Sequence, residues 1–405
     1  MAADTPAPGV LVHGMDGRMT AGDWPPLNGA EVRRVLRRYG LDDPSVSVLW
    51  HSPRPFSAAA VLSHPGGRLF VKRHHRSVRT PSALAAEHRF MAHLAAGGVP
   101  VPEVLSAAGA TAVGVGDWTY ELHRPPPGED LYRSTMSWEP FLTAGHAAAA
   151  GAALARLHRV AECYEAPARP SGVLVANWVS GGDDLVGAVE DLVGARPALA
   201  EALARRPWRA DLARVLSPWH RPLAAVAGRL RPQWTHNDWH ASNLFWRAVG
   251  GGAEVSGVID FGLSNRTTAV YDLATAVERH VVGWLEGDGG AHPVHLDQMA
   301  ALVGGYRSVR PLEAVEAEAL PALLPLVHVE LALSELEYFE AVVGSPANAD
   351  LAYGAFLLGH AAWFATPAGR VLLDELRGAA EGDPAGEGPG TAGEIGELGG
   401  PWPRT

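Results

Sequence analysis

The sequence contains almost no cysteine and no long hydrophobic run. Cys163 is its one cysteine, so it can form neither an intrachain disulfide nor a zinc or iron–sulfur site built from cysteines. No segment reaches the roughly 18 uninterrupted apolar residues that mark a membrane-spanning helix. The opening stretch, MAADTPAPGV, has neither the basic nor the apolar part of a secretion signal. We therefore expect a cytoplasmic protein with no membrane partner.

Basic residues are also too few for a nucleic-acid-binding surface. The chain has 33 Lys and Arg against 44 Asp and Glu, a formal net charge of -11. Binding to a phosphate backbone needs clustered Lys and Arg, and the one basic run, Lys72 to Arg79, is short and interrupted. The hydrophobic content of 47% is sufficient for a large domain or two lobes. The composition predicts a globular protein without a nucleic-acid partner.

The pattern along the chain predicts an α+β fold of two lobes. Short apolar runs separated by turns predict a small N-terminal lobe of about five antiparallel strands and one helix packed on them. A run of three prolines then prevents any strand from continuing, and the helical periodicity that follows predicts a larger, mainly helical lobe. Gly-rich and Pro-rich ends without periodicity predict flexible segments. The predicted boundaries are 1–28 for a flexible leader, 29–122 for the N-terminal lobe, 123–378 for the C-terminal lobe and 379–405 for a disordered tail.

A loop motif at His236–Asn243 gives the first chemical signal. It reads His-Asn-Asp-Trp-His-Ala-Ser-Asn and stands between structured segments, where functional loops occur. Phosphoryl transfer needs a carboxylate that orients or deprotonates the attacking hydroxyl, and magnesium held against the triphosphate. Asp238 suits the first role. The amide oxygen of Asn243 is a hard ligand of the kind that magnesium prefers.

A second motif, Gly257–Gly262, ends an apolar strand in a carboxylate. The strand would hold Asp260 rigidly, and Gly262 would let the chain turn away. Alone, such a string fits the end of any buried strand. Asp260 follows Asn243 by 17 residues, with a glycine-rich hairpin between them. We predict that the two motifs together form one magnesium site.

An upstream lysine and glutamate fit the same chemistry. Lys72 ends a predicted strand, and Glu87 follows it by 15 residues on a predicted helix. Kinases use a lysine on the nucleotide phosphates that is held by a helix carboxylate. Taken singly, each residue reads as a solvated side chain. With the two downstream motifs present, we predict an ion pair between Lys72 and Glu87.

Together these residues resemble the aminoglycoside phosphotransferase and choline kinase superfamily, over about residues 30 to 370. His240, the second histidine of the loop, distinguishes this superfamily from most protein kinases. The resemblance implies a protein-kinase-like fold that uses ATP and Mg²⁺. By position, it implies Asp238 as catalytic base, Asn243 and Asp260 as magnesium ligands, Lys72 on the ATP phosphates, Glu87 holding Lys72, Tyr120, Glu121 and Leu122 as the hinge whose backbone meets adenine, and Asp272 as a support beneath the loop.

Two further features of the sequence qualify this site. Two histidines near an aspartate can suggest zinc, but without cysteine or a regular third ligand we interpret His236 and His240 as loop supports. The segment Ser52–Ser57 lacks the glycines of a phosphate-covering loop. Arg54 and Ser57 are its candidate donors to phosphate.

The acceptor is not identified by the sequence, because a fold does not choose a substrate. Acidic residues at Glu129, Asp130, Glu330, Glu335, Glu337 and Glu340 suit either an amine-binding site or a solvated acidic face, and we favour the solvated face. The leading hypothesis is phosphorylation of a hydroxyl on a small molecule, such as an amino-bearing antibiotic or a sugar. Three alternatives stay open: a Ser/Thr kinase of a natural-product precursor peptide, a homoserine-type or sugar-type metabolic kinase, and a nucleotide-binding pseudokinase.

Overall fold

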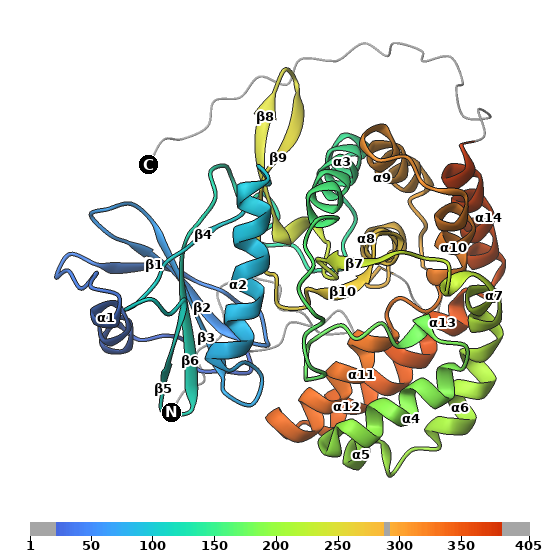
Figure 1. Ribbon diagram of the computed structural model, residues 1–405, viewed down its shortest axis with the longest axis horizontal. Coiled ribbons are helices and arrows are strands. Elements are labelled where there is room, and N and C mark those ends of the chain that lie inside the picture. Colours follow the sequence, from blue (N-terminus) through green and yellow to red (C-terminus); the bar gives the residue numbers. More distant parts are fainter. Residues whose placement is uncertain (1–21, 287–291, 383–405) are drawn as a thin grey trace.

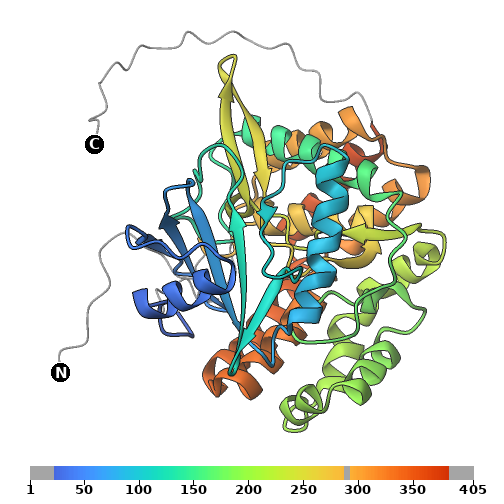
Figure 2. The same ribbon diagram turned by 60° about the vertical axis from the view of Figure 1, so that its left-hand side comes forward.

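An antiparallel sheet of six strands forms the N-terminal lobe of this computed structural model, which describes residues 22–286 and 292–382. The strand order is β1-β2-β3-β6-β4, and β5 also pairs with β6. Helix α1 packs its apolar residues on one face of the sheet, while α2 lies between the sheet and the helical lobe (Figures 1 and 2). The elements are α1 (Gly29–Arg38), β1 (Ser47–His51), β2 (Ala58–Ser63), β3 (Leu69–His75), α2 (Pro81–Ala96), β4 (Glu103–Val104), β5 (Ala112–Val115) and β6 (Trp118–Arg124).

Side chains at the start of each N-terminal helix explain where it begins. Asn28 precedes α1 and accepts a hydrogen bond from the Glu31 amide at 3.0 Å. Thr80 does the same for the Ala83 amide at 3.2 Å, and Pro81 occupies the first turn of α2. Such caps satisfy amides that have no partner inside the helix. They fix the start of α2, the helix that carries Glu87.

The C-terminal lobe is a helical body with two short strand pairs. Helices α3 and α9 pack so closely that a Cβ on Gly151 of α3 would lie 2.0 Å from the Leu302 carbonyl oxygen. The absence of a side chain at Gly151 therefore permits this contact. The helices are α3 (Ala144–Ala161), α4 (Leu185–Ala195), α5 (Pro197–Leu203), α6 (Trp208–Val215), α7 (Ser217–Ala227), α8 (Ala269–Val281), α9 (Leu296–Val309), α10 (Ala314–Leu323), α11 (Val329–Glu337), α12 (Pro346–Leu351), α13 (His360–Trp363) and α14 (Pro367–Glu381). Short 3₁₀ segments are η1 (Val179–Gly181) and η2 (Ala241–Asn243), and π-helical segments are η3 (Tyr338–Val343) and η4 (Ala352–Gly359).

The strand pairs bring the two motif loops together. Strand β7 (Pro232–Thr235) ends just before His236, and β10 (Asn265–Thr268) begins just after Gly262. The two strands are antiparallel, with Thr235 opposite Asn265. Strands β8 (Leu244–Val249) and β9 (Gly252–Val258) form the projecting hairpin in Figure 1. At its base the Ile259 amide donates to the Asn243 carbonyl oxygen at 2.9 Å.

The linker between the lobes is Pro125–Gly128, and it runs against the β8–β9 hairpin. Gly128 has a φ of 112° and lies so close to the hairpin that a Cβ there would sit 2.1 Å from the Ser256 hydroxyl oxygen. The Ser256 hydroxyl donates to the Pro127 carbonyl oxygen at 2.8 Å. A glycine is therefore required both for the backbone angle and for the close approach.

The predicted fold class is confirmed, with several differences in detail. The N-terminal lobe has two helices rather than one, because α1 also covers the sheet. Within the predicted leader, two residues pack on the N-terminal lobe: Leu27 is buried in the core, and Trp24 stacks on His75 with ring centroids 5.3 Å apart. Residues 1–21 lie outside the described part of the chain. Helix α14 extends through Glu381, and residues 383–405 of the predicted tail also lie outside it. Among the described helices, none has the length and apolar content to cross a membrane.

Candidate active site

The loop that carries Asp238 is held from below by Asp272 of α8. The two Asp272 oxygens accept hydrogen bonds from the backbone amides of His236 at 2.7 Å and Asn237 at 2.9 Å. Asn237 has a positive φ of 63°, as does Asp260 with 58°. Positive φ is unfavourable for most residues with a side chain and concentrates at functional sites. The Asp272 carboxylate stabilises this turn, where the resemblance placed a support.

The two loop histidines make hydrogen bonds within the site. His236 Nε2 donates to the Ile259 carbonyl oxygen at 3.0 Å, and its Nδ1 accepts from the Asp238 amide at 3.2 Å. His236 thus ties the catalytic loop to the strand that leads to Asp260. His240 Nδ1 contacts the Ser242 hydroxyl at 2.9 Å, and its Nε2 lies 3.6 Å from Asp238 Oδ1.

Asp238 lies in a cationic environment that includes a residue not predicted from the sequence. Arg279 Nη2 is 3.0 Å from Asp238 Oδ1, and the Asn243 amide nitrogen is 3.3 Å from Oδ2. Burial would raise the pKa of Asp238, but His240 and Arg279 outweigh it and hold this pKa below its ordinary value. Asp238 is therefore ionised, as a proton acceptor must be. Arg279 follows Asp272 by seven residues on α8, a spacing that would have placed both on one face.

Lys72 pairs with Asp260 across the cleft between the lobes. Its ammonium lies 2.9 Å from both carboxylate oxygens. Partial removal from water would raise the pKa of Asp260, but Lys72 reverses this and lowers it. Lys72 is also the only lysine in the sequence. The sequence predicted both residues for the site, with Lys72 paired to Glu87.

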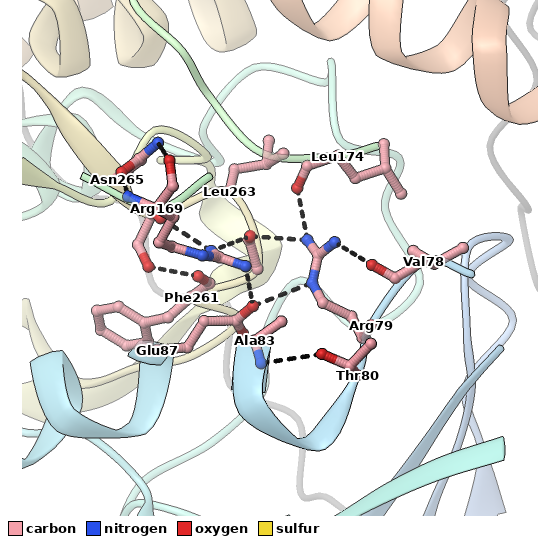
Figure 3. Close-up of polar contacts among 12 residues, drawn as sticks. Val78, Arg79, Thr80, Ala83, Glu87, Arg169, Leu174, Phe261, Leu263 and Asn265 are labelled. Carbon is pink, nitrogen blue, oxygen red and sulfur yellow. Dashed lines mark hydrogen bonds and ion pairs between the residues drawn. The ribbon is translucent and has the colours of Figure 1, made fainter. Parts of the chain in front are cut away.

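The predicted Lys72–Glu87 ion pair is wrong for this structure, because Glu87 binds two arginines. Arg79 Nε lies 3.0 Å and Arg169 Nη2 lies 2.5 Å from Glu87 Oε1. Figure 3 shows both guanidinium groups converging on this carboxylate. Both arginines also donate to the Gly262 carbonyl oxygen at 2.8 Å. Glu87 thus connects α2 to the loop that follows Asp260.

The predicted hinge at Tyr120–Leu122 is also wrong. These residues lie inside β6, paired with β3 on one side and with β5 or the residues beside β4 on the other. The Leu122 carbonyl oxygen, for example, accepts from the Leu105 amide at 2.9 Å. Backbone groups used in a ladder cannot also bind adenine. The chain leaves the sheet after Arg124, so the linker Pro125–Gly128 occupies the hinge position.

The Glu121 side chain has a structural role that the sequence did not predict. His74 Nε2 and His88 Nε2 each lie 2.8 Å from one of its two oxygens, and His123 Nε2 lies 3.2 Å from it. Burial would raise the pKa of Glu121, but the histidines hold it well below the ordinary value. Because His88 belongs to α2, this cluster fixes α2 against the sheet.

Two cavities meet at the Lys72–Asp260 pair. The first opens between apolar side chains of both lobes, with Ala59, Val61 and Phe70 on one side and Phe245 and Ile259 on the other. Pro125 and Pro126 of the linker also line it. We call it the nucleotide cavity, since such apolar walls suit a purine base. The residues that line both cavities are Arg54, Ser57, Lys72, Asn243 and Asp260.

The second cavity lies on the Asp238 side, and we call it the acceptor cavity. Trp138, Arg279 and Glu335 line it together with Asp238. The Arg279 guanidinium lies over the Trp138 ring at 4.5 Å from its centroid. Burial raises the pKa of Glu335 to about 8. The acceptor cavity therefore presents both a buried cation and a buried carboxyl group near the predicted base.

The interpretation of the late acidic residues as a solvated face is wrong for three of them. Glu330, Glu335 and Glu337 on α11 are all buried. Glu330 accepts from the backbone amides of Asn177 and Val179, and Glu337 pairs with Arg196. Glu330 and Glu337 are therefore structural, since a buried carboxylate needs such partners. Glu335 lines the acceptor cavity.

The two-lobed fold and the site between the lobes are those of a protein-kinase-like phosphotransferase. A family model described as the phosphotransferase enzyme family matches residues 56–312. The chain belongs to this family.

Curated relatives and solved structures agree with this membership. A homoserine kinase of Methylocella silvestris is 38% identical over 98 residues, 24% of this chain and 29% of that protein. A homoserine kinase of Brucella anthropi is 29% identical over 247 residues, 61% of this chain and 65% of that protein. The matched region thus spans less than two thirds of these relatives.

Two solved structures share the fold. A Plasmodium vivax ethanolamine kinase aligns with a TM-score of 0.53 at 13% identity, covering 84% of this chain and 89% of that one. An amicoumacin kinase in complex with AMP-PNP, Ca²⁺ and Ami aligns with a TM-score of 0.51 at 16% identity, covering 88% of this chain and 97% of that one. At these identities the likeness concerns the fold alone.

Proposed function

We propose that the protein transfers the γ-phosphoryl group of ATP to a hydroxyl of a small molecule, with Mg²⁺. One observation carries the proposal: Asp238, Asn243, Asp260 and Lys72 converge where the nucleotide cavity meets the acceptor cavity. A phosphoryl donor on one side and a hydroxyl on the other would meet at these four side chains. The single cysteine is compatible with a reducing compartment, and a cytoplasmic location is part of the proposal.

The residues present fit a magnesium ion. Asp260 offers a half-exposed carboxylate, and both hydrogen bonds that the Asn243 side chain makes to described residues use its nitrogen. The amide oxygen is therefore available. Hard oxygen donors of this type, completed by phosphate oxygens and water, suit Mg²⁺. When bound, the ion would neutralise charge that develops on the phosphates.

The protein residues divide the remaining work between them. Lys72 would leave Asp260 and contact the phosphates, since one ammonium serves either anion. Asp238 would accept a hydrogen bond from the acceptor hydroxyl and take its proton, and Arg279 keeps this carboxylate ionised and oriented at 3.0 Å. Asp272 and His236 hold the loop so that these positions do not change during the reaction.

A hydroxy amino acid is our more specific candidate for the acceptor. The acceptor cavity contains a cation, Arg279, that can bind a carboxylate and a carboxyl group, Glu335, that can bind an amine. Both lie beside Asp238, so they fit a short molecule with all three groups. The homoserine kinases among the relatives act on such a compound by name.

An ATP-consumption assay tests the proposal. Wild-type protein and Asp238→Asn would be compared on homoserine, serine, ethanolamine, 4-hydroxybutyrate, a hexose and an aminoglycoside, with product mass measured. Asp238-dependent phosphorylation of any of these supports the general function, and a preference for homoserine over both single-charge analogues supports the specific one. A protein that binds no ATP in the presence of Mg²⁺ would contradict both.

A further inference from the structure

The segment Ser52–Ser57 between β1 and β2 covers the site without the usual source of phosphate donors. Glycine-rich loops bind phosphates with backbone amides. Here Pro53 and Pro55 have no amide hydrogen, the Ser52 amide donates to Ala59 at 2.8 Å, and the Arg54 amide donates to the Ser52 hydroxyl at 3.3 Å. Of the six residues of this segment, Phe56 and Ser57 keep backbone amides for a phosphate, so most of the contact falls to side chains.

Arg54 is placed to supply it. Its guanidinium reaches from the N-terminal lobe to the C-terminal lobe, where Nη2 donates to the Thr135 carbonyl oxygen at 2.8 Å and Nη1 to the Ser137 hydroxyl at 3.3 Å. The two prolines beside it restrict the backbone to extended conformations. Phe56 packs on Tyr338 with ring centroids 4.9 Å apart. The whole segment is therefore fixed across the cleft before any ligand binds.

The charge of Arg54 is available to a ligand. Its contacts within the described chain are with two neutral oxygens, and no described carboxylate lies within ion-pair distance. Those contacts use two of its five N–H groups. Arg54 also lines both cavities, together with Lys72 and Asp260.

We propose that Arg54 is a catalytic residue that binds the phosphoryl group during transfer and replaces the glycine-rich loop. This inference rests on the proposed kinase function. In the step, the acceptor oxygen forms a bond to the γ-phosphorus while the bond to the β–γ bridging oxygen breaks. The electron pair of that bond stays on ADP, and the hydroxyl proton passes to Asp238. The equatorial oxygens of the moving group pass the junction of the cavities, where Arg54 lies.

The test separates binding of the transition state from binding of ATP. Arg54→Ala, Arg54→Lys and the control Arg76→Ala would be compared; Arg76 is an exposed arginine of the same lobe, outside both cavities. The measurements are the rate of Mg·ATP hydrolysis with water as acceptor, the Kd of AMP-PNP, and the Kd of ADP with aluminium fluoride, which mimics the phosphoryl group in transfer. Thermal melting reports folding.

Arg54→Ala should lower kcat and the affinity for ADP–aluminium fluoride by about 100-fold, as loss of a transition-state donor does, while the Kd of AMP-PNP changes by less than about threefold. Free guanidinium should restore part of the rate, and Arg54→Lys should fall between. Equal weakening of AMP-PNP and ADP–aluminium fluoride, or a rate within about threefold of wild type, overturns the proposal. If Arg54→Ala does not fold, the Kd values of AMP-PNP and of ADP–aluminium fluoride for Arg54→Lys decide between these outcomes. A wild-type protein that neither binds AMP-PNP nor hydrolyses ATP would instead refute the kinase function itself.

Discussion

The Lys72 ammonium lies 2.9 Å from both carboxylate oxygens of Asp260, a residue 188 positions later in the chain. The pair joins β3 of the N-terminal lobe to the loop after β9 of the C-terminal lobe. In this pair, the Asp260 carboxylate occupies the place of the phosphate that would bind Lys72. The Lys72 ammonium likewise occupies the place of the magnesium ion that would bind Asp260. Under the proposed function, we expect nucleotide binding to exchange this ion pair for a contact of Lys72 with phosphate and a contact of Asp260 with magnesium.

Lys72→Ala should weaken binding of Mg·AMP-PNP by at least about tenfold, the effect of losing one charge-assisted contact of roughly 1.5–3 kcal/mol. The affinity would be measured by titration calorimetry. Arg247→Ala, which removes one partner of the exposed Arg247–Glu254 pair, serves as the control and should leave it unchanged. Unaltered affinity in Lys72→Ala would show that this lysine does not contact the nucleotide.

Asp238→Asn should lower kcat by about 10² to 10⁴, the usual range for a general base, and leave AMP-PNP binding nearly intact. The amide keeps the shape of the side chain but cannot take a proton. Asp374→Asn, at a side chain that is 75% exposed, is the matched control. Steady-state rates with saturating ATP give the comparison, and full activity of Asp238→Asn would exclude its role as base.

Glu87→Gln should lower the free energy of unfolding by about 3–5 kcal/mol, because it leaves two buried guanidinium groups without their carboxylate. Arg79, Arg169 and Glu87 are all buried. Glu190→Gln breaks a pair with Arg209 whose side chains are 46% and 61% exposed, and it should cost no more than about 1 kcal/mol. Urea unfolding of both variants measures the difference. Equal effects would mean that the Glu87 cluster does not hold α2 in place.

Glu335→Gln should flatten the pH dependence of stability. Burial raises the pKa of Glu335 to about 8 in the folded protein, whereas the unfolded chain releases this proton near the ordinary pKa of 4.5. Between these values the folded state binds more protons, so the unfolding free energy falls as pH rises. Melting temperatures from pH 5 to pH 9 should decline less in Glu335→Gln than in wild type. Glu375→Gln, at an exposed position, should keep the wild-type slope; an unchanged slope in Glu335→Gln would show that this carboxyl is not protonated.

The sequence predicted those parts of the site that are continuous in the chain. Asp238 and Asn243 share one loop, and Asp260 follows the end of strand β9 by two residues, so residue type and spacing sufficed. Strand β2 coincides with the short apolar run Ala58–Ser63, which turns flank on both sides. Local pattern decides such elements.

The wrong predictions concern contacts between distant segments. Glu87 binds Arg169 from 82 positions away, and nothing in the local sequence of α2 distinguishes this partner from Lys72. The hinge was placed too early, because β6 continues beyond Leu122, where His123 pairs with Phe70 of β3 and Arg124 pairs with Glu103 of the two-residue strand β4. Tertiary pairing of this kind has no signature in a single strand.

The single lysine has a chemical consequence for anyone who studies this protein. Apart from the α-amino group, Lys72 is the only primary amine that the sequence offers, and its side chain is 14% exposed in the pair with Asp260. An amine-selective acylating reagent therefore reports on one position in the cleft. The rate at which Lys72 reacts, followed by the mass of its peptide so that labelling of the α-amino group is kept separate, would measure occupancy of the cleft without an assay for the product and before the acceptor is known.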